Sequence, residues 1–291
     1  MCDEQTLEDD ETLLANTGQV SRRFFGVMSM AAALAACATP PADAHDVVEQ
    51  DVTITTPDGS CDAYFVHPAT GRHPGVLVWP DILGLRPAFR VMGKRLAQAG
   101  YSVLVVNPFY RSARSPVAPE GSSFADPALR TRLMGYTSVF TPQTQMSDAT
   151  AFIAFLDAQR AVDTRRKIGT TGYCMGGPFT MRTAAAVPNR VGAAGSFHGG
   201  GLVTDRPDSP HLLVPQMHAN YLICIAQNDD ANAPTVKDTL RQTFAAAHLQ
   251  AEIEVYAANH GWCALDSAVY NEAEAERAWS RLLNLFGTAL A

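Results

Sequence analysis

The residues best suited to chemistry in this chain begin with a cysteine framed by glycines, in the motif Gly172-Tyr173-Cys174-Met175-Gly176-Gly177. The motif follows a β-prone stretch, 167–171, and precedes a helix-like run, 178–186. Strand, tight glycine turn and helix are typical of a nucleophile elbow, which exposes its central side chain. A helix N-terminus favours thiolate, so Cys174 is predicted to be a nucleophile. The alternative is a structural cysteine, because free cysteines are commonly buried.

An acid and a histidine follow at positions that could complete a triad. Asp229 and Asp230 come directly after an apolar, strand-like stretch (221–226), and His260 follows an alternating one. Open α/β sheets carry their catalytic groups just past the carboxyl ends of the strands. A cysteine nucleophile needs a base, and the base needs an orienting carboxylate. The sequence therefore predicts a triad of Cys174, His260 and Asp229, with Asp230 as the alternative acid.

The elements that position these groups read as a mostly parallel, doubly wound α/β sheet with helices on both faces. Continuous apolar runs at 75–79 and 102–106 are typical of buried parallel strands, and the stretch between them has helical spacing. Short alternating strands at 52–56 and 61–66 flank a turn signal and predict an N-terminal β-hairpin. Further helices are expected at 146–159, 175–186, 235–247 and 270–286. The irregular segment 111–142 is expected to form a lid or wall of the pocket.

These motifs resemble those of the dienelactone hydrolase (carboxymethylenebutenolidase) family of α/β-hydrolases, over about residues 52–286. The cysteine elbow is the most specific part, since most α/β-hydrolases carry serine there. Ala226-Gln227-Asn228-Asp229 resembles the turn that bears the family's acid, and His260-Gly261-Trp262 resembles its His-Gly-aromatic end. The resemblance implies one α/β-hydrolase domain over residues 45–291. It also implies hydrolysis of a small-molecule ester or lactone without a cofactor.

The resemblance assigns further roles. Within Trp79-Pro80-Asp81-Ile82-Leu83-Gly84, it implies that the Ile82 amide forms part of an oxyanion hole. Asp81 stands where the family usually has a glutamate that receives the thiol proton, so Asp81 is expected to take that role. Arg111 is expected to contact a substrate carboxylate. The dienelactone enzymes carry an arginine four residues after the histidine, where this chain has Ala264, and this difference weakens the case for a dienelactone substrate.

A tetrahedral intermediate needs two backbone N–H groups aimed at its oxyanion. Met175, directly after the nucleophile, is predicted to supply the second one beside Ile82. The string His198-Gly199-Gly200-Gly201 matches the oxyanion sequence of many lipases and esterases, but theirs precedes the nucleophile and this one follows it. We expect this string to end a strand and to pack beside the site.

The same residues could serve two other classes of function. Cys174 could react with electrophiles or peroxide in a thiol-dependent redox or detoxifying protein, or the fold could bind small acids without turning them over. Redox chemistry needs no acid–histidine pair, and binding needs no triad, so the order Cys174, Asp229, His260 favours hydrolysis. No Cys/His spacing matches a zinc or haem motif, so no metal or cofactor is implied.

A signal peptide over residues 1–44 is predicted. Ser21-Arg22-Arg23-Phe24-Phe25 reads as a signal for the twin-arginine export machinery, and the apolar stretch 27–36 is too short to span a bilayer comfortably. Ala42-Asp43-Ala44 is a small-x-small cleavage site, which would release the mature chain in the periplasm. Leu34-Ala35-Ala36-Cys37 resembles a lipoprotein cleavage box instead and would leave a lipid anchor on Cys37. A cytosolic protein with an amphipathic N-terminal helix is the remaining alternative.

Charge and cysteine content set outer limits on function. Of the 29 acidic and 22 basic residues, seven acids and two arginines lie in the leader, so the rest of the chain is nearly neutral. No basic stripe is present, so nucleic acid is not an expected partner. Cys61, Cys174, Cys224 and Cys263 remain after cleavage, and an oxidising compartment would allow disulfides. Cys224 is expected in the core, and a Cys61–Cys263 disulfide is left open.

Overall fold

The fold is built on eight strands whose apolar sequences explain their places in one sheet. The computed structural model describes residues 44–291. In chain order the strands are β1 (Val47–Thr56), β2 (Gly59–Pro68), β3 (Gly75–Trp79), β4 (Ser102–Val106), β5 (Ile168–Tyr173), β6 (Val191–Phe197), β7 (Asn220–Ala226) and β8 (Ala251–Tyr256). Their order in the sheet is β1-β2-β4-β3-β5-β6-β7-β8. β1 pairs antiparallel with β2 and β2 pairs antiparallel with β4, whereas all other pairings are parallel.

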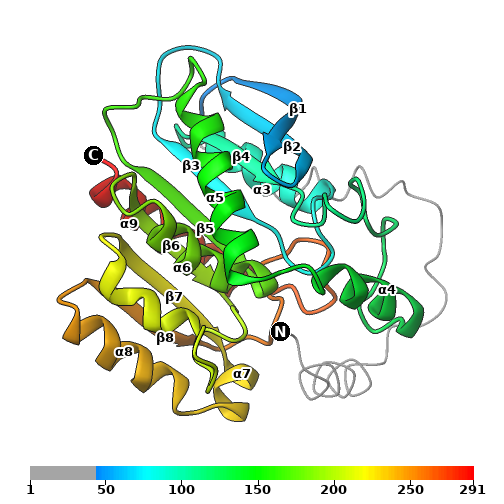
Figure 1. The fold of residues 1–291 in the computed structure, drawn as a ribbon, viewed down its shortest axis with the longest axis vertical. Helices are drawn as coiled ribbons and strands as arrows, with labels where there is room; N and C mark the ends of the chain where they lie inside the picture. Colours follow the sequence, from blue (N-terminus) through cyan, green and yellow to red (C-terminus); the bar gives the residue numbers. More distant parts are fainter. Residues whose placement is uncertain (1–43) are drawn as a thin grey trace.

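Helices cover both faces of this sheet (Figure 1). They are α3 (Pro87–Gln98), α4 (Pro127–Thr137), α5 (Pro142–Asp157), α6 (Gly177–Ala186), α7 (Gln227–Asn232), α8 (Val236–Ala246) and α9 (Glu272–Ala289), with 3-10 turns η1 (Cys174–Gly176) and η2 (Pro210–Gln216). Two clusters of buried apolar side chains pack between the sheet and the helices that cover it. One holds Phe152 of α5, Met181 of α6 and Phe244 of α8, and the other holds Phe89 of α3 and Phe286 of α9. The predicted doubly wound α/β fold is confirmed.

The order in which the chain adds strands to the sheet reverses at β3. From β3 the chain moves to β4 on one side, and it then crosses to β5 on the other side of β3. Such a reversal opens a crevice at the carboxyl ends of the two strands, where open α/β sheets bind their ligands. The elbow after β5 and the Asp81–Ile82 loop after β3 both lie at this point.

Several elements differ from expectation in detail. The N-terminal hairpin is present, but β1 begins at Val47 rather than at residue 52. The segment expected to be irregular contains α4, which is capped by Asp126, whose side chain accepts hydrogen bonds from the amides of Ala128 and Leu129. Among the described residues Cys61, Cys174, Cys224 and Cys263 are all buried and lie outside any disulfide, so Cys61 and Cys263 are not joined.

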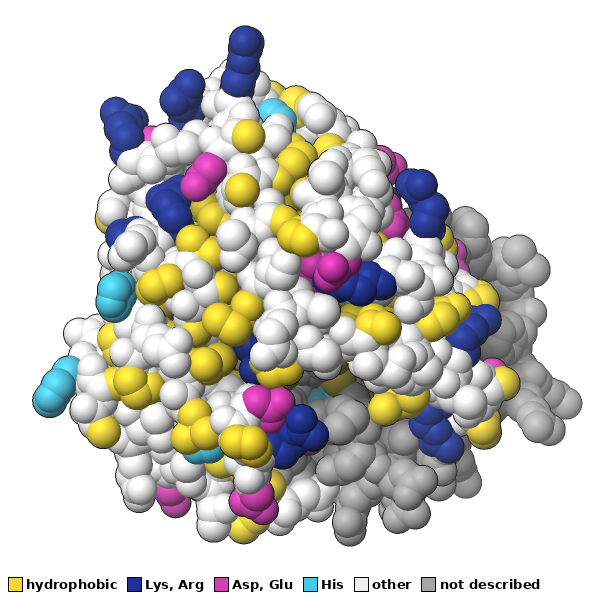
Figure 2. Space-filling view, viewed as in Figure 1, with side chains coloured by type: hydrophobic (Ala, Val, Ile, Leu, Met, Phe, Trp, Pro, Cys, Tyr) yellow, Lys and Arg dark blue, Asp and Glu magenta, His cyan; other side chains and the backbone are white. Residues whose placement is uncertain are grey.

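All but the last residue of the predicted signal peptide, including the twin-arginine motif and Cys37, lies outside the described residues. Within residues 44–291 no helix combines the length and apolar character needed to cross a membrane. On the face drawn in Figure 2, basic and acidic side chains are interspersed over the described surface.

Candidate active site

The turn after β5 has the geometry of a nucleophile elbow. Cys174 has a φ of 51°, a left-handed conformation that side-chain-bearing residues rarely adopt. A Cβ on Gly172 would meet the carbonyl oxygen of Gly176 at 2.1 Å, so only glycine allows the chain to fold back so tightly. The turn leads into α6, whose N-terminal dipole favours a thiolate on Cys174. Strained backbone of this kind is typical of catalytic sites.

The loop after β3 lies directly against this elbow. A Cβ on Gly176 would meet the carbonyl oxygens of Trp79 at 2.4 Å and Pro80 at 2.8 Å. This close approach brings Ile82 and Met175 to one cavity of about 360 Å³, which both residues line. The two amides predicted to form the oxyanion hole therefore come from neighbouring walls of the same cavity.

His260 has a carboxylate at one side of its ring. Its Nδ1 lies 2.8 Å from Oδ2 of Asp229, and its backbone N–H donates to Oδ1 of Asn228 at 2.9 Å. Asp229 and Asn228 belong to the short helix α7, which follows β7 directly, so the end of β7 sets the position of both residues. Asp230 turns away and pairs with Nζ of Lys237 at 2.5 Å. Of the two candidate acids, Asp229 is the one that contacts the histidine.

Cys174 and His260 are brought together around His198. Tyr173 pairs with Phe197 across β5 and β6, so the next residues, Cys174 and His198, leave adjacent strands side by side. The ring of His198 lies edge-to-face on His260, with 4.9 Å between ring centroids. Burial lowers the pKa of His198, and the neighbouring Cys174 thiol acts in the opposite direction. The prediction that the His198–Gly201 string ends a strand beside the site is confirmed.

The cavity divides at the glycines of that string. Gly200 and Gly201 line both the 360 Å³ cavity and a second one of about 160 Å³. The second cavity is lined by Asp229 and His260, whereas the larger one is lined by Ile82 and Met175. The residues predicted to form the oxyanion hole and the predicted catalytic base therefore line two cavities that meet at Gly200 and Gly201.

Asp81 is held in an ion pair. Both of its carboxylate oxygens accept from Arg86, at 2.6 and 2.9 Å, and Oδ1 also accepts from the Leu83 amide at 2.9 Å. Arg86 in turn donates to Asp266 at 2.7 and 2.9 Å. The two carboxylates raise the pKa of Arg86 against the opposing effect of burial. The Oδ2 atom of Asp81 accepts one of these hydrogen bonds, whereas Oδ1 accepts two, so Oδ2 has the remaining capacity to accept a proton.

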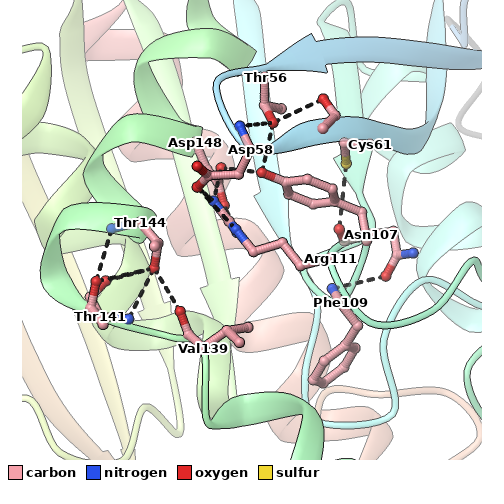
Figure 3. Close-up of polar contacts among 12 residues, drawn as sticks. Thr56, Asp58, Cys61, Asn107, Phe109, Arg111, Val139, Thr141, Thr144 and Asp148 are labelled. Atoms are coloured by element: carbon pink, nitrogen blue, oxygen red, sulfur yellow. Dashed lines mark hydrogen bonds and ion pairs between the residues drawn. The ribbon is translucent and has the colours of Figure 1, made fainter.

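Arg111 points into a different network (Figure 3). Its guanidinium donates to Asp148 at 2.7 and 2.8 Å and to Asp58 at 2.5 and 3.1 Å. Asp148 also accepts from the Tyr110 hydroxyl at 2.7 Å, and burial raises the pKa of this carboxyl group. Arg111 does not line the 360 Å³ cavity. The structure therefore joins the β1–β2 turn to α5 through Arg111 and does not bring this arginine to the elbow.

The sequence did not single out Arg182, a buried charged residue in the cavity wall. Arg182 lines the larger cavity together with Met175, Pro178 and Phe179, which precede it on the turn and helix. The spacing 175, 178, 179, 182 is that of a single helix face, so the helical period could have placed Arg182 beside the elbow. Among residues 44–291, no group of three or more His, Cys, Asp or Glu side chains could hold a metal ion.

Known proteins resemble this chain in sequence and in fold. The model of the dienelactone hydrolase family matches residues 61–290. A carboxymethylenebutenolidase of Rhodococcus opacus is 27% identical over 257 residues, which cover 85% of this chain and 93% of that protein. A putative carboxymethylenebutenolidase of Salmonella typhi is 28% identical over 253 residues, covering 80% and 90%. The crystal structure of a putative dienelactone hydrolase from Klebsiella pneumoniae superposes with a TM-score of 0.72 at 25% identity, covering 84% of this chain and all of that one.

Proposed function

Because this chain belongs to the dienelactone hydrolase family, whose members cleave lactones, we propose that it hydrolyses a small ester or lactone through a Cys174 thioester. Two observations together carry the proposal. Cys174 lies in the elbow with a φ of 51°, and Nδ1 of His260 lies 2.8 Å from Asp229. A positive-φ cysteine at a helix N-terminus and an oriented imidazole are the two parts that a thiol nucleophile requires.

In the acylation half-reaction, His260 takes the thiol proton of Cys174, and the thiolate attacks the carbonyl carbon to form a C–S bond. The amides of Ile82 and Met175 stabilise the oxyanion, and such donors are most effective where water is excluded. Collapse of the intermediate breaks the C–O bond, and the protonated imidazole gives its proton to the leaving oxygen. The cavity lined by His260 is therefore the leaving-group side of the site.

In the deacylation half-reaction, His260 removes a proton from water, and the resulting hydroxide attacks the thioester carbonyl. The C–S bond then breaks, the acid is released and the thiolate recovers its proton. Asp229 holds the imidazole in the tautomer that has Nδ1 protonated and stabilises the positive charge that develops on it. Asp81 is proposed as an alternative to His260 as the acceptor of the single thiol proton. This role would couple Cys174 to the ion pair between Asp81 and Arg86.

Burial argues against a general thiol-redox role. The exposed fraction of Cys174 is 4%, whereas redox-sensing cysteines are usually accessible to solvent. The pKa values of Cys61, Cys224 and Cys263 are all raised, chiefly by burial, so none of them is poised as a resolving thiolate.

Turnover of p-nitrophenyl acetate and of an enol lactone tests the proposal. We expect the purified protein to hydrolyse both esters repeatedly, and Cys174→Ala and His260→Ala to lose about a thousandfold or more in kcat/KM. Release of a single equivalent of p-nitrophenol by the unchanged protein would instead indicate a thiol trap. Absence of both turnover and a burst would leave only a binding role.

We also infer that the chain is exported through the twin-arginine route, on the basis of Ser21-Arg22-Arg23-Phe24-Phe25, the apolar stretch after it and the cleavage site at Ala44. This route carries folded proteins, so Cys174 could be buried before it meets an oxidising compartment.

A further inference from the structure

Two arginines, Arg86 and Arg182, are buried among the described residues, and their guanidinium groups have very different hydrogen-bond partners. Arg86 is held by the carboxylates of Asp81 and Asp266. Arg182, which is 9% exposed, donates only to a backbone carbonyl, that of Asp208, at 3.3 Å. Buried charges are normally paired with an opposite charge, because burial removes their hydration. Arg182 thus forms no ion pair among residues 44–291, and the nearby Asp208 carboxylate, which acts to raise the pKa of Arg182, does not outweigh the effect of burial.

The guanidinium of Arg182 also has an unused donor. Its Nε is buried and has no hydrogen-bond partner among the described residues. Burial lowers the pKa of Arg182, as expected for a cation whose lost hydration is not compensated. An arginine stays protonated even so. The side chain lines the 360 Å³ cavity, so a ligand in that cavity could take the free donor.

The remaining charges in this cavity leave it positive. Arg206 and Asp208 also line it, and they neutralise one another through two hydrogen bonds of 2.9 and 3.0 Å. No other ionisable side chain is found in its wall, so Arg182 provides the net charge. Gln145 contributes a second polar group, whose buried Oε1 has no partner among the described residues. Two buried, unsatisfied polar groups in one cavity indicate a polar ligand group.

We propose that Arg182 forms an anion subsite for the acyl portion of the substrate, so that the preferred substrates are esters or lactones whose acyl chain carries a carboxylate. This assignment rests on the proposed hydrolysis at Cys174. The cavity that Arg182 lines contains the Ile82 and Met175 positions, whereas His260, which must reach the leaving oxygen, lines the other cavity. The carboxylate is therefore on the acyl side. The subsite lies on the elbow helix, away from Arg111, whose guanidinium is already paired.

A matched pair of esters tests the subsite in the full-length protein. Mono-p-nitrophenyl adipate and p-nitrophenyl hexanoate differ at the chain end, which is a carboxylate in one and a methyl group in the other. We expect Arg182→Met to lower kcat/KM for the adipate ester about tenfold or more and to leave the hexanoate ester within about twofold. Arg132→Gln is the control, because Arg132 also donates to a backbone carbonyl, that of Val117, but does not line the cavity.

Equal losses on both esters would overturn the subsite and give Arg182 a structural role. If Arg182→Met does not fold, Arg182→Gln keeps a donor for the Asp208 carbonyl and replaces it in the comparison. Binding of adipate, measured by calorimetry, separates this proposal from the hydrolytic one. Wild-type protein that binds adipate but hydrolyses no ester would retain the subsite and reject the mechanism. Adipate binding that is absent, or that is unchanged in Arg182→Met, would reject the subsite.

Discussion

His198 and His260 lie edge-to-face in the candidate site, with ring centroids 4.9 Å apart. Trp262 also packs edge-to-face on His198, with ring centroids 5.0 Å apart. The Cys174 thiol lies beside the His198 ring, whose nitrogens have no nitrogen or oxygen partner among the described residues, and the φ of His198, 40°, is in the left-handed region. A neutral imidazole is thus packed against the predicted catalytic base by aromatic contact.

Acid should destabilise the fold through His198. Burial lowers its folded pKa below the ordinary 6.5, so the unfolded chain binds the proton more readily. The stability associated with the neutral ring is therefore present above pH 6.5 and is lost as pH falls from there towards the folded pKa. We expect His198→Asn, which tolerates the positive φ, to flatten the pH dependence of the unfolding free energy by up to about 1.4 kcal/mol per pH unit. Urea titrations between pH 5 and 8 measure the slope, and an unchanged slope would contradict this account.

Adjacent aspartates offer a matched comparison. Asp229 contacts His260, whereas Asp230 pairs with Lys237. We expect Asp229→Asn to lower kcat for p-nitrophenyl acetate about a hundredfold or more, because an amide cannot stabilise the imidazolium. Asp230→Asn should stay within about twofold of wild type, because a partly exposed ion pair contributes little. Equal effects from the two changes would remove Asp229 from the proposed triad.

Glycine at the elbow is required by contact rather than by flexibility. A Cβ at residue 176 would lie 2.4 Å from the carbonyl oxygen of Trp79, which is backbone and cannot easily move. Gly176→Ala should therefore lower the unfolding free energy by about 3 kcal/mol or more. Gly135→Ala is the control, since Gly135 lies within α4 and a Cβ there would meet nothing within 4 Å. That change should raise stability by about 0.5–1 kcal/mol, as measured by thermal and urea unfolding.

The inferred export is expected to depend on Arg22 and Arg23. With Arg22 and Arg23 both changed to lysine, we expect the protein to remain in the cytoplasm, because the twin-arginine machinery reads this pair. Cell fractionation followed by mass spectrometry of the mature N-terminus measures both export and the cleavage site. A chain beginning near His45 would support soluble release, and a lipid-modified Cys37 would support anchoring. Export that persists without the arginine pair would contradict the inferred route.

The sequence predicted the elements that carry strong local signals. Parallel strands such as β3 and β4 are continuous apolar runs, so their bounds were predicted to the residue. The choice between Asp229 and Asp230 could not be settled by sequence, because neighbours on one short helix differ only in the direction of their side chains. Helix α4 was missed although Asp126 and Pro127 form a recognisable helix start, since the surrounding Ser, Pro and Gly residues suggested a loop.

Contacts between side chains far apart in the sequence were the feature of the structure that the sequence predicted least well. The sequence could not show that Arg111, which was expected to contact substrate, pairs with Asp148 from a helix 37 residues further along the chain. Arg182 was not singled out, because an arginine on a helix is usually solvated and only the three-dimensional wall of the cavity shows that it is buried.

The central claim is that hydrolysis passes through a thioester on Cys174. Mass spectrometry of protein quenched with acid during p-nitrophenyl acetate turnover tests it most directly, and His260→Ala should retain any acyl group for longer because deacylation needs the imidazole. We predict one acetyl group on the peptide that contains Cys174, formed and lost at rates compatible with kcat, and no such group in Cys174→Ala. Undiminished turnover by Cys174→Ala, or acetylation confined to another residue, would contradict the claim.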